Sequence, residues 1–268
     1  MMERKVYIKA LSQISLCQPD PDYAGMFSVM EARRLSLLMK RALAVSRQTL
    51  DQAGVAMPDA VITGTGLGCI ENTEFFLQSL LGVSDTPLRP THFMQSTHNT
   101  IGSLIAIRLK CHGYNATYSQ LGISFESALL DAWVQIRSGA LDTALVGAFE
   151  EMTPAFAAIL AKAGYTGFVQ PDGRLSETAV SMLLTASPEG ALCELAQVRL
   201  GKAACAEPVP GAAVMTRADY VPRYGDNFSV SALGACDAVA LLAEGPASVL
   251  LKNDFYGKSF ADILLKRI

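Results

Sequence analysis

The sequence predicts an α/β fold in which helices cover both faces of a sheet. Short β-rich apolar runs at Ala60–Thr65, Leu141–Phe149 and Thr178–Ala186 alternate with amphipathic segments, a pattern typical of parallel βαβ units. The chain has 268 residues, of which 50% are hydrophobic, so it can form one large domain or two halves that share a sheet. We therefore expect a buried sheet between helical layers.

The chain is expected to open with a strand and a long helix. Lys5–Ala10 alternates briefly between apolar and polar residues, as a half-buried strand does. Over Met30–Ala53 apolar residues fall on one helical face and charged residues on the other, and Gly54 is expected to end the helix. The strand at Ala60–Thr65 then leads into a glycine turn.

The rest of the first half continues the alternation. Glu71–Leu81 has helical periodicity, and Pro87–His92 is interpreted as a loop. Further elements are expected at Asn99–Lys110 (helix), Asn115–Leu121 (strand), Ser124–Ser138 (helix), Leu141–Phe149 (strand) and Thr178–Ala186 (strand). These segments make the first half a full α/β unit.

The second half is shorter and begins with a segment of little periodicity. Pro188–Gly225 is rich in alanine and proline and is interpreted as an irregular connection. A helix at Ala232–Ala243 and strands at Ser248–Leu251 and Ser259–Leu265 follow. The predicted division is a first half over 1–187, a connection over 188–227, and a truncated second half over 228–268 that packs on the same sheet.

Charge and composition argue against several classes of function. A net charge of −3 does not favour a surface for duplex nucleic acid. The sequence has no cleavable leader pattern and no apolar run of about 18 residues, which predicts a soluble, cytoplasmic protein without a membrane span. The six cysteines are scattered and form no CxxC pair, so we expect no metal, no disulfide framework and no cofactor.

Two short motifs resemble sites of other chemistry. Gly64–Gly68 lies between a strand and a helix, but its spacing is not that of a dinucleotide loop, and we interpret it as a tight turn. Gly122–Glu126 resembles the nucleophile turn of serine hydrolases around Ser124. It lacks the second glycine, and no histidine follows it in the chain, so Ser124 is better explained as a helix cap.

Longer motifs resemble the β-ketoacyl synthases, a family of thiolase type. Asn115–Ala128 is similar to that family's strand, nucleophile turn and helix start, and the match continues without a gap through Gln135–Glu151. Further similarities lie at Gly64–Gly68, Ser176–Leu184 and Ser231–Ala238. The resemblance covers about residues 1–186 well and 228–268 weakly. It implies a thiolase-like αβαβα sandwich with an abbreviated second half.

The same resemblance implies that the catalytic groups are missing. Condensation requires a thiolate that accepts an acyl group and two imidazoles that polarise the malonyl thioester. The nucleophile position holds Gly122, with Gln120 as a polar neighbour, and one histidine position holds Ser231. The second histidine has no counterpart because no histidine follows His112, and the family's glycine-rich gate is reduced to Asp254–Gly257. We therefore expect a chain without ketosynthase activity.

A partner role follows from what the resemblance retains. The chain resembles chain-length factors of aryl-polyene and flexirubin-type pathways, which implies a subunit paired with a full-length β-ketoacyl synthase in fatty-acid or polyketide biosynthesis. Acyl carrier protein is a further expected partner. The expected dimer strand comprises Asn115, Ala116, Thr117, Tyr118 and Ser119. Within Phe93–Leu104 the candidates for the wall of an acyl tunnel are His98, Thr100, Ile101 and Leu104.

Two other functions stay open on the sequence. The chain could be an independent acyltransferase or thioesterase with a displaced nucleophile at Cys69, Cys236 or Ser124. It could also be a homodimeric acyl-binding module without a partner enzyme. Labelling of one cysteine by a thioester analogue would favour the enzyme, stoichiometric acyl binding by a homodimer would favour the module, and co-purification with a synthase would favour the partner subunit.

Overall fold

The computed structural model describes residues 4–17, 19–82, 89–202 and 209–268. Its strands are β1 (Tyr7–Ser15), β2 (Ala60–Gly64), β3 (Tyr114–Tyr118), β4 (Thr143–Glu150), β5 (Thr178–Thr185), β6 (Cys193–Gly201), β7 (Ala213–Thr216), β8 (Ser248–Phe255) and β9 (Ser259–Lys266). Its helices are α1 (Val29–Ala32), α2 (Leu37–Ala53), α3 (Ile70–Leu80), α4 (Pro90–Gln95), α5 (Thr100–Leu109), α6 (Ser124–Ser138), α7 (Pro154–Lys162), α8 (Arg217–Tyr224) and α9 (Val230–Glu244), with a 3-10 turn η1 (Leu121–Ile123).

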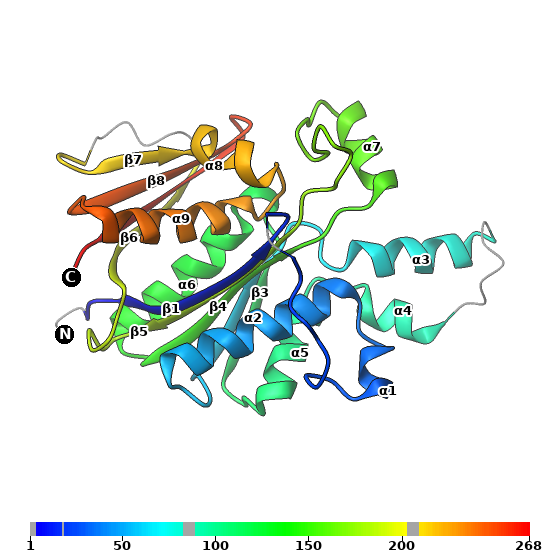
Figure 1. Ribbon diagram of the computed structural model, residues 1–268, viewed down its shortest axis with the longest axis horizontal. Coiled ribbons are helices and arrows are strands. Elements are labelled where there is room, and N and C mark those ends of the chain that lie inside the picture. The colour runs from blue at the N-terminus through cyan, green and yellow to red at the C-terminus, as the bar shows by residue number, and fades with distance from the viewer. Residues whose placement is uncertain (1–3, 18, 83–88, 203–208) are drawn as a thin grey trace.

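The strands join in one sheet that bends into two lobes. The first lobe contains β3, β2, β4, β5 and β1, and the second contains β6, β9, β8 and β7. The strand order is β3-β2-β4-β5-β1-β6-β9-β8-β7. β1 and β6 pair only through Tyr7 with Glu194 and Ile8 with Cys193, so the ladder is short where the lobes meet. Figure 1 shows the two lobes with α6 and α9 between them. Each of these helices packs on strands of both lobes.

Helices bury a hydrophobic cluster on each face of the first lobe. α6 and α9 contribute Phe125, Leu129, Val230 and Leu233 to the main core, and all four side chains are buried. On the other face of that lobe, α2 and α5 cover a second buried cluster. In the described chain no helix packs extensively on the outer face of the β6-β9-β8-β7 lobe. The expected αβαβα sandwich is confirmed. The abbreviated part is the helical layer on this outer face.

Strand direction differs from the expected parallel sheet. β2 runs parallel to β3 and β4, and β7 runs parallel to β8. The pairs β4–β5, β1–β5, β1–β6, β6–β9 and β8–β9 are antiparallel. A parallel pair requires a crossover, whereas short connections such as the turn between β8 and β9 return the chain directly. The prediction of parallel βαβ units therefore holds for the two parallel groups and was wrong for the remaining strand pairs.

The segment Pro188–Gly225 is not the irregular connection that its composition predicted. It contributes β6, β7 and α8 to the second lobe. The alternation of β6 is interrupted by a register shift between Leu195 and Gln197, which exchanges the faces of the residues that follow. A strand with such a bulge does not show the simple period of two that identifies strands in a sequence.

Local capping explains two further differences in the first half. The helix expected over Met30–Ala53 is divided because Ser36 adopts an extended conformation and its Oγ accepts a hydrogen bond from the Met39 N–H, which starts α2. Gly54, with φ of 67°, ends α2 as expected.

The loop expected at Pro87–His92 is partly outside the described residues. Its described part was wrong because Pro90 opens α4, a favoured position for proline.

No helix in the described ranges is long and apolar enough to cross a bilayer.

Candidate functional site

The turn after β3 is closed by its own polar side chains. Ser124 Oγ accepts a hydrogen bond from the Gln120 N–H at 2.8 Å and donates one to the Leu121 carbonyl at 2.7 Å. Leu121 has a φ of 50°, in the left-handed region that non-glycine residues rarely adopt. Ser127 Oγ lies 2.8 Å from Gln120 Oε1. Both hydrogen-bonding functions of the Ser124 hydroxyl are thus used to hold the turn.

The expected nucleophile position faces a packed aromatic ring. A Cβ atom built on Gly122 would lie 2.1 Å from Cδ2 of Phe255, far inside van der Waals contact. Phe255 is the last residue of β8 and is 1% exposed. Its ring packs against those of Phe228 and Tyr165, with centroids 5.4 and 5.9 Å away. Any side chain at position 122 would therefore have to displace this ring.

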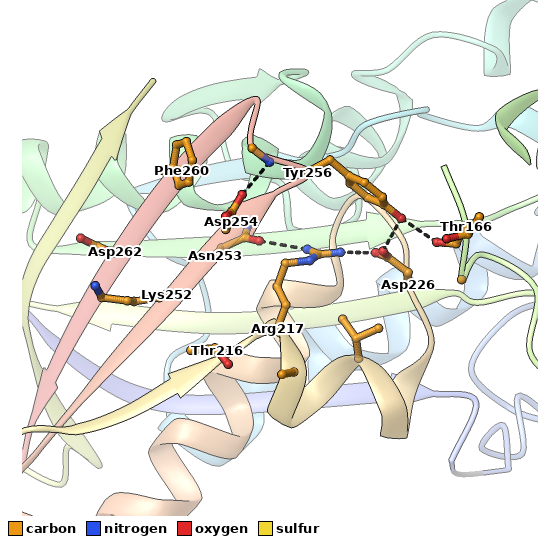
Figure 2. Close-up of a pocket in the computed structure, with 14 residues that line it drawn as sticks. Thr166, Thr216, Arg217, Asp226, Lys252, Asn253, Asp254, Tyr256, Phe260 and Asp262 are labelled. Atoms are coloured by element: carbon orange, nitrogen blue, oxygen red, sulfur yellow. Dashed lines mark hydrogen bonds and ion pairs between the residues drawn. The ribbon is translucent and has the colours of Figure 1, made fainter. Parts of the chain in front are cut away.

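A buried polar chain runs from this turn to the protein surface. Asn253 Nδ2 donates to the Gly122 carbonyl and to Glu126 Oε1, each at 2.7 Å. Its Oδ1 accepts a hydrogen bond from Arg217 Nη1 at 2.9 Å. Arg217 also forms an ion pair with Asp226, as Figure 2 shows. The Asn253 amide thus forms hydrogen bonds with groups from η1, α6 and α8.

The polar chain ends at a surface cavity of about 760 Å³. The Tyr256 hydroxyl lies 2.8 Å from Asp226 Oδ2 and 2.6 Å from the Thr166 carbonyl, which ties the β8–β9 turn to the loop after α7. Figure 2 shows the remaining wall, formed by side chains from β8 and β9. These are Lys252, Asp254, Phe260 and Asp262. The cavity therefore has an aromatic and mixed-charge lining and is separated from Gly122 by Phe255 and Asn253.

Two buried polar side chains lie at the expected histidine position. Ser231 is in the first turn of α9 and is 1% exposed. Glu126 is completely buried, and its carboxyl group interacts with the Ser231 hydroxyl and the Asn253 amide. Burial raises the pKa of Glu126, which favours the neutral acid. No hydrogen bond or ring contact given by the described residues joins His92, His98 or His112 to this centre.

The glycine turn after β2 holds a buried carboxylate. The N–H groups of Gly66 and Leu67 donate to Glu150 at 2.7 and 2.9 Å, and the hydroxyls of Thr65 and Ser229 donate to it at 3.3 and 3.0 Å. Burial raises the pKa of Glu150 to about 7. Burial also raises the pKa of the neighbouring Glu151 to about 8. Sequence reasoning identified the turn but missed its carboxylate, which comes from the end of β4.

The three displaced nucleophile candidates lie in unreactive surroundings. Cys69 is fully buried, and burial together with Glu151 raises the pKa of its thiol. Cys236 is also buried, and burial raises its pKa as well. A thiol is reactive as the thiolate, which both environments disfavour. Ser124 is occupied in the turn, and the described residues provide no metal cluster of three or more ligands.

The four tunnel candidates lie in different environments. His98 is exposed in the turn before α5, and Thr100 is half-buried, with its Oγ1 3.0 Å from that of Thr97. Ile101 is buried in the core beneath α2 and α5. Leu104 is half-buried and lines a small cavity beside Arg108. Their role in a tunnel stays a prediction.

The candidate dimer strand lies at one edge of the sheet. β3 pairs with β2 and is terminal in the strand order. The Thr65 N–H donates to the Tyr118 carbonyl at 3.0 Å, so the main chain of Tyr118 points toward β2. Because direction alternates along a strand, the main-chain groups of Thr117 and Asn115 point toward the open edge. Ser119 continues the chain beyond the strand.

Comparisons with known proteins agree with this architecture. The β-ketoacyl synthase N-terminal domain family matches residues 12–214. A sequence comparison with curated proteins found no match. Among solved structures, the AntDE:AntF complex, a type II polyketide acyl-carrier protein with its ketosynthase, matches with a TM-score of 0.79 and 14% identity, covering 99% of this chain and 100% of that chain.

Two further matches are paired assemblies. The ishigamide ketosynthase/chain length factor matches with a TM-score of 0.73 and 17% identity, covering 98% of this chain and 99% of that chain. The ketosynthase ApeO in complex with its chain length factor ApeC, from Xenorhabdus doucetiae, matches with a TM-score of 0.73 and 14% identity, covering 99% and 98%. These chains match end to end, so the short second half belongs to the shared fold.

Proposed function

The chain belongs to the β-ketoacyl synthase family by its N-terminal domain, and from this premise we propose that it is a catalytically inactive partner subunit of a full-length β-ketoacyl synthase. The observation that carries the proposal is the contrast between a filled nucleophile position and an open sheet edge. Phe255 occupies the space that a side chain at Gly122 would need. β3 meanwhile presents unpaired main-chain groups.

The absence of acyl transfer follows from the chemistry at the turn. Gly122 has no side chain to acylate, and the hydroxyl at the histidine position, Ser231, cannot supply the cationic stabilisation that an imidazole gives. Cys69 and Cys236 are buried and disfavoured as thiolates. The displaced-nucleophile acyltransferase or thioesterase therefore has no supporting observation among the described residues.

Association is supported by the surface around β3. An unpaired strand edge is a template for pairing with another chain. Ile107, on the side of α5 opposite α2, is 75% exposed, and Val134 on α6 is 49% exposed. Tyr114 and Leu121 at the two ends of the segment are also exposed. An open edge flanked by apolar side chains on both layers is typical of an interface that continues a sheet between subunits.

A second apolar surface supports insertion into a partner. Figure 1 shows α3 and α4 projecting side by side from the body of the molecule. The rings of Phe76 and Phe93 pack between them at 5.2 Å. Six large apolar residues in or next to these helices are nevertheless exposed: Phe75, Leu77, Leu80, Leu81, Phe93 and Met94. Because Phe93 opens the expected tunnel segment and His98 lies within it, this surface would form part of the wall of the synthase's acyl tunnel, and Thr100 and Leu104 follow in α5.

The biosynthetic setting is proposed at two levels. The matches to chain-length-factor assemblies support fatty-acid or polyketide biosynthesis with carrier-bound acyl chains. The AntDE:AntF complex supports acyl carrier protein as a further partner of the heterodimer. The aryl-polyene type of pathway and a cytoplasmic location stay predictions of the sequence.

Co-expression with a full-length synthase tests the proposal. The expected result is a 1:1 complex by light scattering, with no acyl adduct on this chain by intact-mass analysis after incubation with acyl carrier protein. Thr117→Pro should abolish the complex, because it removes an N–H that points to the open edge. Val214→Glu, on the exposed face of the terminal strand β7 at the other end of the sheet, is the matched control and should leave the complex intact.

Other outcomes would redirect the function. A wild-type chain that stays monomeric with the synthase present would refute the partner role. A homodimer that binds acyl groups stoichiometrically would favour the acyl-binding module. A stable acyl adduct on any residue would refute the claim of inactivity.

A further inference from the structure

A second cavity lies far from the nucleophile turn, on the outer helical layer. It has a volume of about 290 Å³ and lies between α2, α5 and the loop that carries Met26 and Phe27. Leu43 from α2 and Ile105 from α5 contribute apolar walls. Ligand cavities commonly range from about 300 to about 1,000 Å³, are mainly apolar and contain a few polar groups. The volume of this cavity is just below that range.

One polar atom in the cavity is left without a partner. Ser46 lines the cavity and is 2% exposed, and its Oγ has no hydrogen-bond partner among the described residues. A buried hydroxyl without a partner is uncommon because desolvation costs free energy that a hydrogen bond normally offsets. A bound molecule with a polar group near Ser46 would supply the missing hydrogen bond.

Two guanidinium groups line the cavity, each paired with one carboxylate. Arg108 donates from Nη1 to Glu31 Oε1 at 2.6 Å and from Nη2 to the Met26 carbonyl at 2.9 Å. Arg47 forms an ion pair with Asp51 through Nε at 2.9 Å. A guanidinium carries five N–H donors, so these contacts leave donors on both arginines for a carboxylate. The contacts also fix Arg108 in position.

We propose that this cavity binds a medium-chain carboxylic acid, with the alkyl chain between Leu43 and Ile105 and the carboxylate toward Arg47, Arg108 and Ser46. An apolar slot bounded by guanidinium groups complements an amphiphile with one negative end. The free acid is preferred over its pantetheine thioester, because the thioester replaces the charged carboxylate by a neutral group. Binding of the acid can be measured on this chain without the synthase, so the proposal stands independently of the proposed function.

Calorimetric titration of the wild-type chain with butanoate, hexanoate and octanoate tests the site. Affinity should rise about fourfold for each added methylene until the cavity is full, in line with the transfer free energy of a methylene group. Octanoyl-pantetheine should bind more weakly than octanoate. Equal or tighter binding of the thioester would overturn the preference for a free acid.

Three variants localise the binding. Ser46→Leu and Leu109→Phe fill the cavity from α2 and α5 respectively and should each weaken octanoate binding tenfold or more. Arg47→Gln should weaken it two- to fivefold, consistent with an exposed charge. Arg174→Gln is the matched control, because Arg174 forms a similarly exposed ion pair with Asp172 away from the cavity, and it should have no effect.

The proposal fails under either of two results. Octanoate that produces no saturable binding at millimolar concentration would overturn it. Binding that persists unchanged in both cavity-filling variants, with their thermal unfolding intact, would place the acid elsewhere and overturn it as well.

Discussion

The turn at Gly122 and the strand that leads into it have opposite characters. At the turn, Phe255 fills the available volume and Asn253 saturates neighbouring polar groups from three elements. A few residues earlier, β3 leaves one edge open, with exposed apolar side chains beside it. The turn is therefore saturated by contacts within the chain, whereas β3 keeps an open edge, which we propose as the partner surface.

The comparison predicts that substitutions at the turn change stability, whereas substitutions at the edge change association. The largest effect is expected for Asn253→Leu. It removes a hydrogen-bond partner from the buried Gly122 and Glu126 and from the largely buried Arg217, and the free energy of unfolding should fall by about 3–5 kcal/mol. Urea denaturation measures the loss.

Asp254→Asn on the same strand is the control for that experiment. Asp254 is exposed, so its substitution should change the free energy of unfolding by less than about 0.5 kcal/mol. If Asn253→Leu had an equally small effect, the polar chain would not be a stabilising feature of the turn.

A smaller loss is expected for Gly122→Cys. The new Cβ collides with the Phe255 ring, and overpacking of this kind costs about 1–3 kcal/mol. Phe255→Leu should recover part of the loss, which a double-mutant cycle of urea unfolding measures. Neither variant should condense malonyl units, since the histidine position still holds Ser231. A Gly122→Cys chain as stable as the wild type would show that Phe255 does not block the position.

The pH dependence of stability provides a test near the glycine turn. Burial raises the pKa of Glu151 to about 8 in the folded chain, from an ordinary value of 4.5, so the folded state binds a proton that the unfolded state releases. Wild-type stability should therefore fall as pH rises from about 5 through about 8. Glu151→Gln keeps the acceptor for the Glu71 N–H and should weaken this fall, raising Tm at pH 9 by about 2–4 °C relative to the wild type.

Glu189→Gln is the matched control for the pH experiment because Glu189 is exposed. Its Tm should follow the wild type at every pH. A Glu151→Gln variant that shows no greater advantage at pH 9 than at pH 6 would contradict a protonated Glu151 in the folded chain. Glu150, whose pKa burial raises to about 7, should account for part of the remaining fall.

The smallest effect on stability and the largest on association are expected at the edge. Ile107→Glu places a charge on an exposed side of α5, so the free energy of unfolding should change by less than about 0.5 kcal/mol. At an interface the same charge would be desolvated without a partner, which should weaken binding to the synthase tenfold or more. Calorimetric titration against the purified synthase measures this affinity. An unchanged affinity would show that this side of α5 lies outside the interface.

The sequence by itself determined the features that depend on short-range pattern. Helical periodicity placed α6 at its observed bounds, Ser124–Ser138, and the β-rich run at Thr178 placed β5. The assignment of Gly122 to the nucleophile position rests on the resemblance of the surrounding sequence to the β-ketoacyl synthases and stays a prediction. Periodicity failed for β6, where the register shift at Leu195 exchanges the two faces of the strand.

Only the tertiary structure decided which residues surround Gly122. Asn253 is 131 positions from Gly122, and no periodic pattern connects them, yet the folding of β8 beside the turn brings the amide to the Gly122 carbonyl. Phe255 reaches Gly122 in the same way. Short-range patterns report which face of an element is buried, whereas contacts between distant segments depend on how the whole core packs, and that is why the filled position emerged only from the fold.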